Sequence, residues 1–331
     1  MLKKYISIFA LFALSACGVT SQLTQTNTFE TERCVNMGNA LDAPWEGAWG
    51  HTIDLANFAR IRAAGFDTVR LPVKWSGHLG ASNFIDPAFR ARVDEVLNAA
   101  LAADLNIVLN IHHFDDLMNE PEAHYDAFLD IWKQLADHYQ GLPERVSFEV
   151  LNEPSRKLKG DIMRRAQRDA IAIIRQSNPT RIVILGGENW SNIDSLRTNY
   201  LAPDPNVIYT FHYYTPFNFT HQKAPWLGSN APQRTQSWGS AEDHQVVREH
   251  MARARDFSER VGRQVFLGEF GAFEAAPESS RQSYMKAVTH EAEAAGIGWC
   301  VWSFTSSFPL FDDDIKTWLP GQLEALGLSA P

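Results

Sequence analysis

The sequence predicts an α/β protein, a (β/α)8 or TIM barrel that forms a single domain. Eight apolar, β-rich runs alternate with amphipathic helical stretches along the chain. Several runs are apolar almost throughout, as in Ile107-Val108-Leu109, which is typical of parallel strands buried on both faces. About 300 residues follow an amino-terminal export segment without a second linker or a short repeat, and this length suits one large domain.

The expected strands are short segments rich in Val, Ile, Leu and Phe, each followed by a loop. They cover residues 35–39, 68–72, 106–112, 146–152, 181–186, 207–212, 264–269 and 298–302. The longest insertion, residues 213–240, follows the sixth strand. Eight such units in one domain favour a closed barrel over a doubly wound sheet.

The expected helices have start and stop signals between these strands. Asp86-Pro87 and Asn119-Glu120-Pro121 are typical of helix starts, where a capping side chain precedes a proline in the first turn. Gly65, Gly141 and Gly296 follow helical stretches and indicate their ends.

Residues 1–16 have the pattern of a lipoprotein export signal. A basic segment at Lys3 and Lys4 precedes an apolar run over residues 5–14, and small residues then lead to Cys17. We expect Cys17 to be lipidated, residues 17–33 to form a polar tether and residues 34–331 to form the folded domain. The alternative is an ordinary signal peptide with a chance cysteine. The expected location is the cell envelope, at an outer membrane, with the domain facing the periplasm or the outside.

The chain is acidic, which limits its partners. Removing residues 1–16 would also remove Lys3 and Lys4 and change the formal net charge from −9 to −11. A net acidic chain argues against nucleic acid as a partner and suits a neutral polymer. We expect the protein to contact a membrane only through the lipid on Cys17. We also expect the protein to be a monomer.

After lipidation of Cys17, the remaining thiols would be Cys34 and Cys300. They form either a disulfide, which an oxidising compartment permits, or two small buried apolar side chains. The sequence leaves both possibilities open, because it does not give the distance between their Cα atoms.

Polar side chains lie at or just beyond the carboxyl ends of the expected strands, where a barrel of this type has its chemistry. They are Asn39, Arg70, His112, His113, Asn152, Glu153, His212, Tyr214, Glu269 and Trp302. Glu153 and Glu269 each end a strand-like run, and two carboxyl groups facing each other are what cleavage of a glycosidic bond needs. We therefore expect these residues to converge at one end of the barrel.

Six motifs in a fixed order make the chain resemble family 5 glycoside hydrolases, and most closely their bacterial endo-β-1,4-glucanases. They begin at residues 36, 69, 110, 151, 211 and 267, and include Leu151-Asn152-Glu153-Pro154 and Leu267-Gly268-Glu269-Phe270-Gly271. The resemblance extends from about residue 34 to about residue 320 and implies that residues 34–331 are a catalytic domain for hydrolysis.

The resemblance implies a role for each site residue. Glu153 would be the general acid/base and Glu269 the nucleophile of a retaining double displacement, with Arg70 and Tyr214 keeping Glu269 ionised. Asn152 would bind the 2-hydroxyl, His113 a ring hydroxyl, and Trp302 the face of the sugar before the scissile bond. His212 would lie beside the acid/base, and Asn39, His112 and Trp226 complete the expected substrate-binding set.

Two other interpretations apply to parts of this set. His112 and His113 followed by Asp115 and Asp116 suggest a metal site, but neighbouring residues on a strand point to opposite faces, so we expect no metal and no cofactor. Arg70 on its own is compatible with a structural ion pair. Asp42, Asp115, Asp116 and Glu149 are expected to be structural.

The chain has ten tryptophans, and flat aromatic rings pack well against pyranose faces. We expect sugar subsites from Trp45, Trp49, Trp75, Trp226, Trp238 and Trp302. Trp132 is assigned to the core, and Trp190 and Trp318 are left undecided.

The expected function is retaining endo-hydrolysis of β-1,4-glucosidic bonds in cellulose-type or mixed-linkage β-glucans. The alternatives on the same site are an endo-β-1,4-mannanase, a glucomannanase or a xyloglucanase. A non-enzymatic alternative is a surface lipoprotein that binds glycan without cutting it. Residues 305–311 depart from the family pattern, and we expect this loop to reshape the subsites before the scissile bond.

Overall fold

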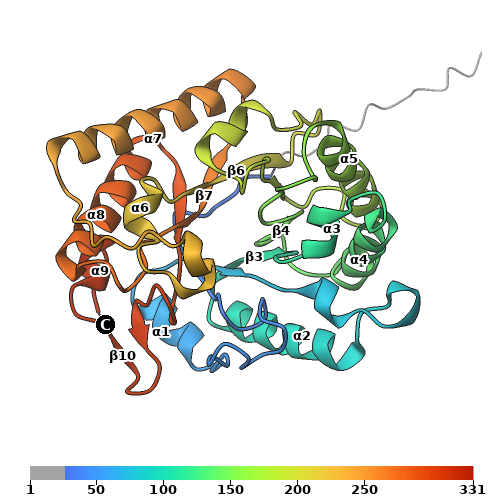
Figure 1. The fold of residues 1–331 in the computed structure, drawn as a ribbon. Helices are drawn as coiled ribbons and strands as arrows, with labels where there is room; N and C mark the ends of the chain where they lie inside the picture. Colours follow the sequence, from blue (N-terminus) through green and yellow to red (C-terminus); the bar gives the residue numbers. More distant parts are fainter. Residues whose placement is uncertain (1–26, 331) are drawn as a thin grey trace, which may run out of the picture.

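The computed structural model describes residues 27–330. Eight parallel strands close into a barrel in chain order, and β1 pairs with β8 to complete it. The barrel strands are β1 (Arg33–Asn36), β2 (Thr68–Leu71), β3 (Asn106–Asn110), β4 (Val146–Glu149), β5 (Val183–Leu185), β6 (Val207–Tyr213), β7 (Val265–Phe270) and β8 (Gly298–Val301), and a separate antiparallel pair is formed by β9 (Phe311–Asp312) and β10 (Thr317–Trp318). The predicted (β/α)8 barrel is confirmed, and Figure 1 shows it enclosed by helices.

Every residue of the barrel strands is buried except the first residue of β1, β3 and β8, which is half-buried. Burial on both faces explains why the strands could be recognised from apolar runs. Most strands end earlier than predicted: β3 ends at Asn110 and β4 at Glu149. His112, Asn152 and Glu153 therefore lie on the loops that follow the strands.

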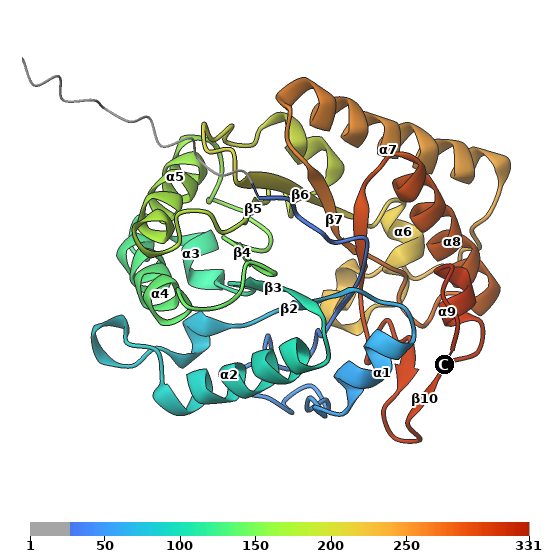
Figure 2. The same cartoon turned by 180° about the vertical axis from the view of Figure 1, so that it is seen from behind.

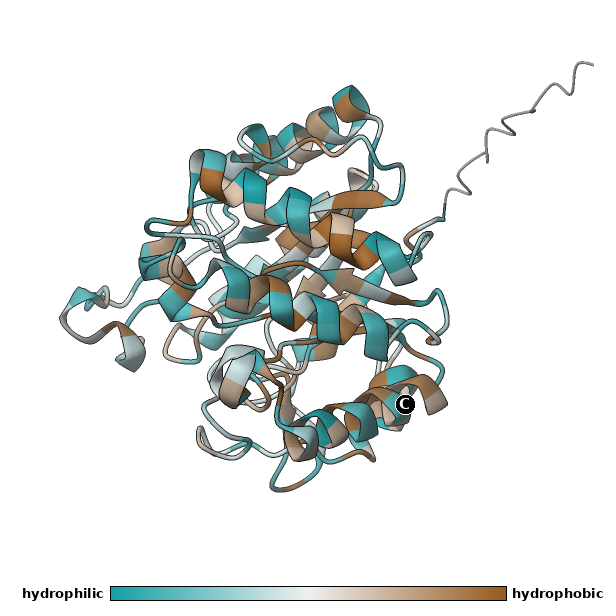
Figure 3. Ribbon diagram, turned by 90° about the vertical axis from the view of Figure 1, so that its right-hand side faces the viewer, coloured by the Kyte–Doolittle hydropathy of each residue, from teal (hydrophilic) through white to brown (hydrophobic). Residues whose placement is uncertain are grey.

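Helices follow most of the strands and form the outer layer. They are α1 (Asn57–Ala63), α2 (Pro87–Ala102), α3 (Asp115–Asn119), α4 (Tyr125–His138), α5 (Gly160–Ser177), α6 (Phe217–Thr220), α7 (Ala241–Val261), α8 (Glu278–Ala294) and α9 (Gln322–Ala325). Between β5 and β6 the chain forms only the 3-10 helix η3 (Ile193–Arg197). Figure 3 shows hydrophilic and hydrophobic residues alternating along these helices, as expected for elements with one face on a core.

The helix-start prediction at Asp86-Pro87 is confirmed, because the Asp86 carboxylate accepts hydrogen bonds from the amides of Ala88 and Phe89 at 2.7 and 3.2 Å. The prediction at Asn119-Glu120-Pro121 was wrong. Asn119 ends α3, and a turn separates it from α4, which begins at Tyr125. In that turn the Glu120 carbonyl accepts hydrogen bonds from the amides of Ala123 and His124, so the proline belongs to a turn between two helices.

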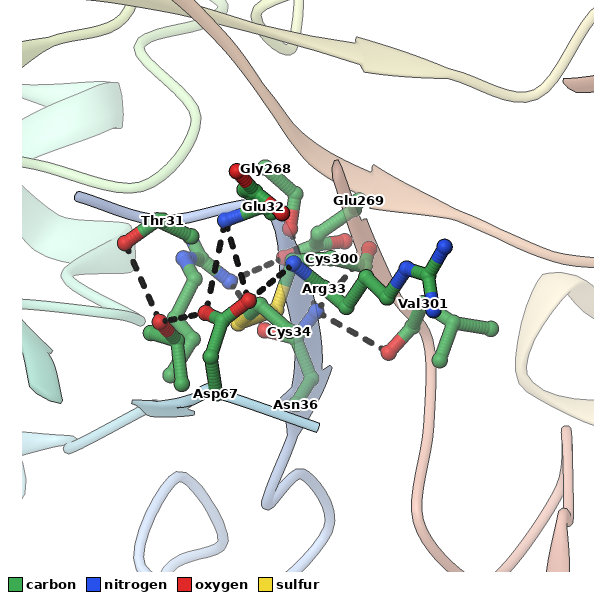
Figure 4. The surroundings of a disulfide bond; sticks show 12 residues. Thr31, Glu32, Arg33, Cys34, Asn36, Asp67, Gly268, Glu269, Cys300 and Val301 are labelled. Atoms are coloured by element: carbon green, nitrogen blue, oxygen red, sulfur yellow. Dashed lines mark hydrogen bonds and ion pairs between the residues drawn. A yellow bond between two sulfur atoms is a disulfide. The ribbon is translucent and has the colours of Figure 1, made fainter. Parts of the chain in front are cut away.

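Cys34 and Cys300 form a disulfide, which settles the question that the sequence left open. They are directly paired across β1 and β8, with Cα atoms 4.1 Å apart. Figure 4 shows the disulfide where the first and last barrel strands meet. The bond covalently joins the two strands that close the barrel, across 266 positions of sequence.

Residues 27–33 form a segment, here called the amino-terminal strap, that packs against the amino-terminal end of the barrel. Phe29 is 7% exposed and lies in a cluster with Phe266 and the disulfide cysteines. Its backbone amide donates to the Gln264 side chain at 3.0 Å, and the amide of Arg33 donates to Asp67 at 2.8 Å. Figure 2 shows this segment in blue, running across the barrel.

The strap corrects one predicted boundary. The polar composition of residues 27–33 predicts that they belong to the tether, but their polar groups hydrogen-bond the barrel and Phe29 packs at its base. Residues 27–33 therefore belong to the folded domain, which the sequence interpretation began at residue 34. The rest of the predicted tether, the export signal and Cys17 lie outside the described residues. Among the described helices, none is long and apolar enough to cross a membrane.

Candidate active site

A cleft of about 910 Å³ opens at the carboxyl ends of the strands. The loops after β3, β4, β5 and β6 form its walls, and residues from several of them face it. Its lining includes His112, His113, Asn152, Glu153, Trp190, His212, Tyr214, His221 and Trp226. The cleft thus contains most of the residues that the sequence placed at the strand ends.

Arg70, on β2, is fully buried and organises the floor of the site. Its guanidinium donates to both Glu149 oxygens at 2.6 and 2.7 Å, to Glu269 Oε1 at 2.7 Å and to Asn152 Oδ1 at 2.6 Å. Burial opposes its positive charge, but the charges of Glu149 and Glu269 outweigh burial and raise the pKa of Arg70. The residue is therefore a fixed cation that holds carboxylates from β4 and β7 and an amide from the β4 loop in place.

Glu269, on β7, is 5% exposed and accepts hydrogen bonds at both oxygens. Arg70 donates to Oε1, and the Tyr214 hydroxyl donates to Oε2 at 2.9 Å. Burial raises the pKa of Glu269, while the positive charge of Arg70 opposes this rise. Burial also raises the pKa of Tyr214 well above its usual value, so this hydroxyl keeps its proton and remains a donor to Glu269.

Glu153 lies on the loop after β4, and 26% of its side chain is exposed to the cleft. Its Oε1 is 2.8 Å from Nδ1 of His212. Burial raises the pKa of Glu153 to about 8, against the opposing effect of Arg70. Burial lowers the pKa of His212, so this imidazole is neutral near pH 7. A neutral imidazole does not stabilise the ionised form of Glu153 as a positive charge would.

The two glutamates face each other at short range. One oxygen of Glu153 and one of Glu269 lie within 4.8 Å of each other, together with a ring nitrogen of His212. Retaining glycosidases have carboxyl groups about 5 to 5.5 Å apart, whereas inverting enzymes need about 6.5 to 9.5 Å to admit a water. The spacing between these oxygens therefore fits direct attack by a carboxylate.

Asn152 is held by neighbours on both sides. Its side-chain oxygen accepts from Arg70, and its backbone carbonyl accepts from the Ser191 hydroxyl at 2.9 Å. Because the side-chain oxygen is occupied, the amide NH2 group remains available as a donor in the cleft that Asn152 lines.

His112, His113 and Trp302 form a second part of the site. The rings of His112 and Trp302 stack with centroids 5.5 Å apart and planes 8° apart. Burial lowers the pKa of His112 well below its usual value and that of His113 to about 4, so both imidazoles are neutral. Trp302 depends on Gly38, because a Cβ at Gly38 would lie 2.4 Å from the indole ring.

The expectation that His112 and His113 point to opposite faces was wrong. Strand β3 ends before them, so strand alternation no longer applies, and their rings meet edge to face with centroids 4.6 Å apart. Their nitrogens and an Asp42 oxygen lie within 4.8 Å of one another, as do the ligand atoms of Glu153, His212 and Glu269. These two groups are the places among the described residues where a metal ion could bind.

Asp42 and Asn39 lie in the loop after β1. Asp42 accepts a hydrogen bond from the amide of Ala40 at 2.8 Å, which fits its predicted structural role. Burial raises the pKa of Asp42 to about 6, and its second oxygen has no partner among the described residues. Asn39 has a φ of 66° and a buried side-chain nitrogen that is likewise without a described partner.

The tryptophans divide between surface and core. Trp226 is 51% exposed and Trp190 is 55% exposed, and both line the cleft. Trp45 and Trp49 are also exposed, as their predicted subsite roles require. Trp75 and Trp238 are buried, so their assignment to subsites was wrong: Trp75 donates to the Asn110 carbonyl, and Trp238 packs against Tyr284. Trp132 lies in the core as predicted.

Three contributing residues were missed or underrated in the sequence. The Asn36 side-chain NH2 group donates hydrogen bonds to the Gly268 carbonyl on β7 and to the Val301 carbonyl on β8. Its side-chain oxygen accepts a hydrogen bond from Arg70. Glu149 was expected to be structural and holds Arg70 through two hydrogen bonds. His221 lies on the insertion after β6 and lines the cleft. Asn36 and Glu149 could have been found from their positions at strand ends, but His221 has no such signal.

This geometry agrees with the comparison of the whole chain with known families. The sequence matches the profile of Cellulase (glycosyl hydrolase family 5) over residues 17–307. The chain belongs to glycoside hydrolase family 5. Membership in this family confirms the resemblance that the six motifs indicated and accounts for the barrel and its paired glutamates.

Individual family 5 proteins are similar over most of this chain. Endoglucanase H of Acetivibrio thermocellus is 31% identical over 299 residues, which are 88% of this chain and 32% of that protein. The structure of Thermotoga maritima Cel5A in complex with cellobiose is 39% identical, with a TM-score of 0.87, and covers 89% of this chain and 97% of that chain. The structure of the same enzyme with mannotriose is 38% identical at the same TM-score and the same coverage.

This chain thus spans about a third of the length of Endoglucanase H and nearly all of the Cel5A domain.

Proposed function

We propose that this family 5 protein is a retaining endo-β-1,4-glucanase in which Glu153 is the general acid/base and Glu269 the nucleophile. The observation that supports the proposal most directly is the pair of glutamates with oxygens within 4.8 Å of each other in different environments. Glu269 is bonded to a fixed cation and a hydroxyl, whereas Glu153 contacts a neutral imidazole and has a pKa of about 8.

In the first step Glu269 attacks the anomeric carbon, and Glu153 donates its proton to the glycosidic oxygen as that bond breaks. Arg70 and Tyr214 direct Glu269 through separate oxygens, so the carboxylate cannot rotate away from the sugar. Arg70 also fixes Asn152, whose NH2 group would donate to the 2-hydroxyl, a hydrogen bond that strengthens in the transition state.

In the second step the charge balance between the two glutamates reverses. The glycosyl ester removes the negative charge of Glu269, so the pKa of Glu153 falls and Glu153, having given up its proton, remains ionised. It then accepts a proton from water, which attacks the anomeric carbon from the leaving-group side. Two inversions at this carbon give overall retention.

Replacing the nucleophile tests the proposal. Glu269→Gln is nearly isosteric but cannot form the ester, so reducing-sugar release from carboxymethyl-cellulose and barley β-glucan should fall by at least about a thousandfold. Binding of cello-oligosaccharides by calorimetry should persist. Normal hydrolysis by this variant would exclude the proposed nucleophile, and a wild-type protein that binds but never cuts would favour the glycan-binding lipoprotein.

The second candidate is a β-1,4-mannanase or glucomannanase activity on the same site. The neighbour that supports it is Thermotoga maritima Cel5A, whose structure includes a complex with mannotriose. Parallel assays on glucan, glucomannan, β-mannan and xyloglucan decide between a strict glucanase and a broader enzyme. Comparable rates on β-glucan and β-mannan would establish dual specificity, and no release from β-mannan at high enzyme concentration would exclude it.

We further propose that the enzyme is an envelope lipoprotein anchored through Cys17. The support is the basic, apolar and small-residue pattern of residues 1–17. Cys17→Ser should move the protein from the membrane fraction to the soluble fraction after expression in a bacterial host. Retention of the variant in the membrane fraction would contradict anchoring through this cysteine.

A further inference from the structure

The loop between β5 and β6, two strands labelled in Figure 2, contains a run of residues with a left-handed backbone. Asn189, Trp190 and Ser191 have φ angles of 57°, 57° and 51°. The chain then returns to the barrel at Asn192, which forms a parallel bridge with His212 on β6. Residues other than glycine rarely adopt this conformation, so a run of three needs contacts with its neighbours to hold it.

Ser191 is fully buried and makes hydrogen bonds to two segments of the active site. Its hydroxyl donates to the backbone carbonyl of Asn152 at 2.9 Å and lies 3.3 Å from the carbonyl of Gly187. Its own backbone carbonyl accepts a hydrogen bond from the amide of His212 at 2.7 Å. Ser191 therefore connects the residue before Glu153 with the residue whose ring contacts Glu153 at 2.8 Å.

The neighbouring residue of the run holds the backbone on the other side of Glu153. The amide of Trp190 donates a hydrogen bond to the carbonyl of Pro154 at 3.1 Å. The proline also restricts the backbone of the residue that precedes it, which is Glu153. The chain is thus held one residue before and one residue after Glu153, and both contacts come from the loop after β5.

The other catalytic groups are held by different contacts. The Asn152 side chain accepts a hydrogen bond from Arg70 at 2.6 Å, whereas its backbone carbonyl accepts from Ser191. Glu269 is held by Arg70 and by Tyr214. The Ser191 hydroxyl therefore acts on the backbone next to Glu153 and not on the contacts that hold Glu269, so its effect on proton donation can be measured separately.

We propose that Ser191 is a positioning residue for the acid/base. Its hydroxyl and its carbonyl set how Glu153 and His212 face each other, so that the proton of Glu153 points toward the glycosidic oxygen. This proposal rests on the proposed function of Glu153. Because Ser191 is buried, it acts through Glu153, and its loss should slow the bond cleavage that needs a proton more than the cleavage that needs none.

Two substrates separate proton donation from nucleophilic attack. Cellotetraose has a sugar leaving group that needs a proton, whereas the leaving group of 2,4-dinitrophenyl β-cellobioside departs without one. The measured quantity is the ratio of kcat/KM for cellotetraose to kcat/KM for the dinitrophenyl substrate. Ser191→Ala removes the hydrogen bond to the Asn152 carbonyl, and the ratio should fall about tenfold, which is the effect of one lost hydrogen bond. The value of kcat/KM for the dinitrophenyl substrate should stay close to that of the wild type.

Two further variants separate this effect from damage to the loop. Ser191→Gly also removes the hydroxyl, but glycine adopts a positive φ without strain, so this variant should fold and show the same fall in the ratio. Ser195→Ala is the matched control. Ser195 lies on η3 in the same loop and has a buried hydroxyl without a hydrogen-bond partner among the described residues, so its removal should leave the ratio unchanged. Thermal unfolding shows that the compared samples are folded.

An equal loss on both substrates in Ser191→Ala and Ser191→Gly would show a structural role and overturn the proposal. An unchanged ratio in these variants would overturn it too, as would a fall of the same size in Ser195→Ala. A wild-type protein that cleaves neither substrate would instead contradict the proposed function.

Discussion

At the residue scale, the environments of Glu153 and Glu269 predict the pH dependence of the reaction. Glu153 must be protonated to act as the acid, and its pKa is about 8, so activity should decline as the pH rises through about 8. Glu269 must be ionised, and burial raises its pKa above 4.5, so activity should also decline on the acid side, beginning above pH 4.5. The profile of kcat/KM against pH should therefore be bell-shaped, with its maximum between these two pKa values.

A variant assigns the basic limb of this profile. Glu153→Ala removes the acid, but a dinitrophenyl leaving group departs without a proton, so glycosylation by an aryl cellobioside should remain measurable. In that variant the decline near pH 8 should disappear, while the acid limb that reports Glu269 stays. A basic limb that persists in Glu153→Ala would assign that limb to another group.

Gly38 is a residue whose lack of a side chain supports the site. Its missing Cβ leaves room for the Trp302 ring, since an added Cβ would lie 2.4 Å from it. Gly38→Ala should displace the ring from the sugar before the scissile bond and lower kcat/KM by about tenfold or more, the scale of a lost or misplaced aromatic contact. Gly141→Ala is the control, because a Cβ there meets nothing within 4 Å. Equal kinetics in the two variants would show that Trp302 tolerates the added methyl group.

At the scale of elements, strands were easier to predict than the segments between them. Buried parallel strands such as β5 consist of consecutive apolar residues, so their composition reveals them. Their ends depend on pairing with neighbouring strands, which explains why β4 ends at Glu149 and not at Asn152. The Asn119-Glu120-Pro121 signal failed because a proline fits both a helix start and a turn between two helices.

The exposure of side chains and the contacts between residues far apart in the sequence could not be predicted from local sequence patterns. Trp75 and Trp238 follow strands or loops, as exposed platforms do, but neighbouring elements cover them. The disulfide depends on two Cα atoms being 4.1 Å apart across 266 positions, a distance that only the closed barrel sets. Glu153 and Glu269 could be picked out because each stands in a short motif at or just after a strand end, whereas His221 stands in an insertion without such a motif.

The disulfide between β1 and β8 should stabilise the barrel without taking part in the chemistry. Cys34 and Cys300 are fully buried at the seam between the first and last strands. A cross-link that closes so long a loop restricts the unfolded chain, and loss of a native disulfide costs about 2 to 5 kcal/mol. The Cys34→Ala/Cys300→Ala double variant should therefore unfold at a lower temperature in calorimetry, with wild-type kcat at 25 °C. An unchanged melting temperature would show that strand pairing alone secures the seam.

At the scale of the whole molecule, the two ends of the barrel have different roles, because one holds the cleft and the other is covered by the strap. The carboxyl ends of the strands hold the cleft and its titratable groups, while the amino-terminal ends are covered by the strap. The chain therefore enters the fold on the side opposite the cleft. If Cys17 is anchored in a membrane, this arrangement directs the cleft away from the point of attachment and leaves it open to a long polymer.

The strap should contribute to stability in proportion to what it buries. Phe29 packs on Phe266 with ring centroids 5.1 Å apart, at the base of the barrel beside the disulfide. Truncating a buried phenylalanine to alanine costs about 3 kcal/mol or more, because contacts are lost and a cavity remains. A protein that begins at residue 34 loses this packing together with the hydrogen bonds of Phe29 and Arg33, so it should melt well below one that begins at Asn27.

Phe29→Ala should account for most of that difference, because the strap's surface hydrogen bonds exchange with water at small net cost. Thermal unfolding of the three proteins measures the contributions, and kcat on soluble β-glucan at 25 °C serves as the control, since the strap is at the end of the barrel remote from Glu153. A truncated protein as stable as the longer one would mean that the strap only follows the barrel surface. Lower kcat in a folded truncated protein would instead show that packing at the base of the barrel affects the positions of Glu153 and Glu269.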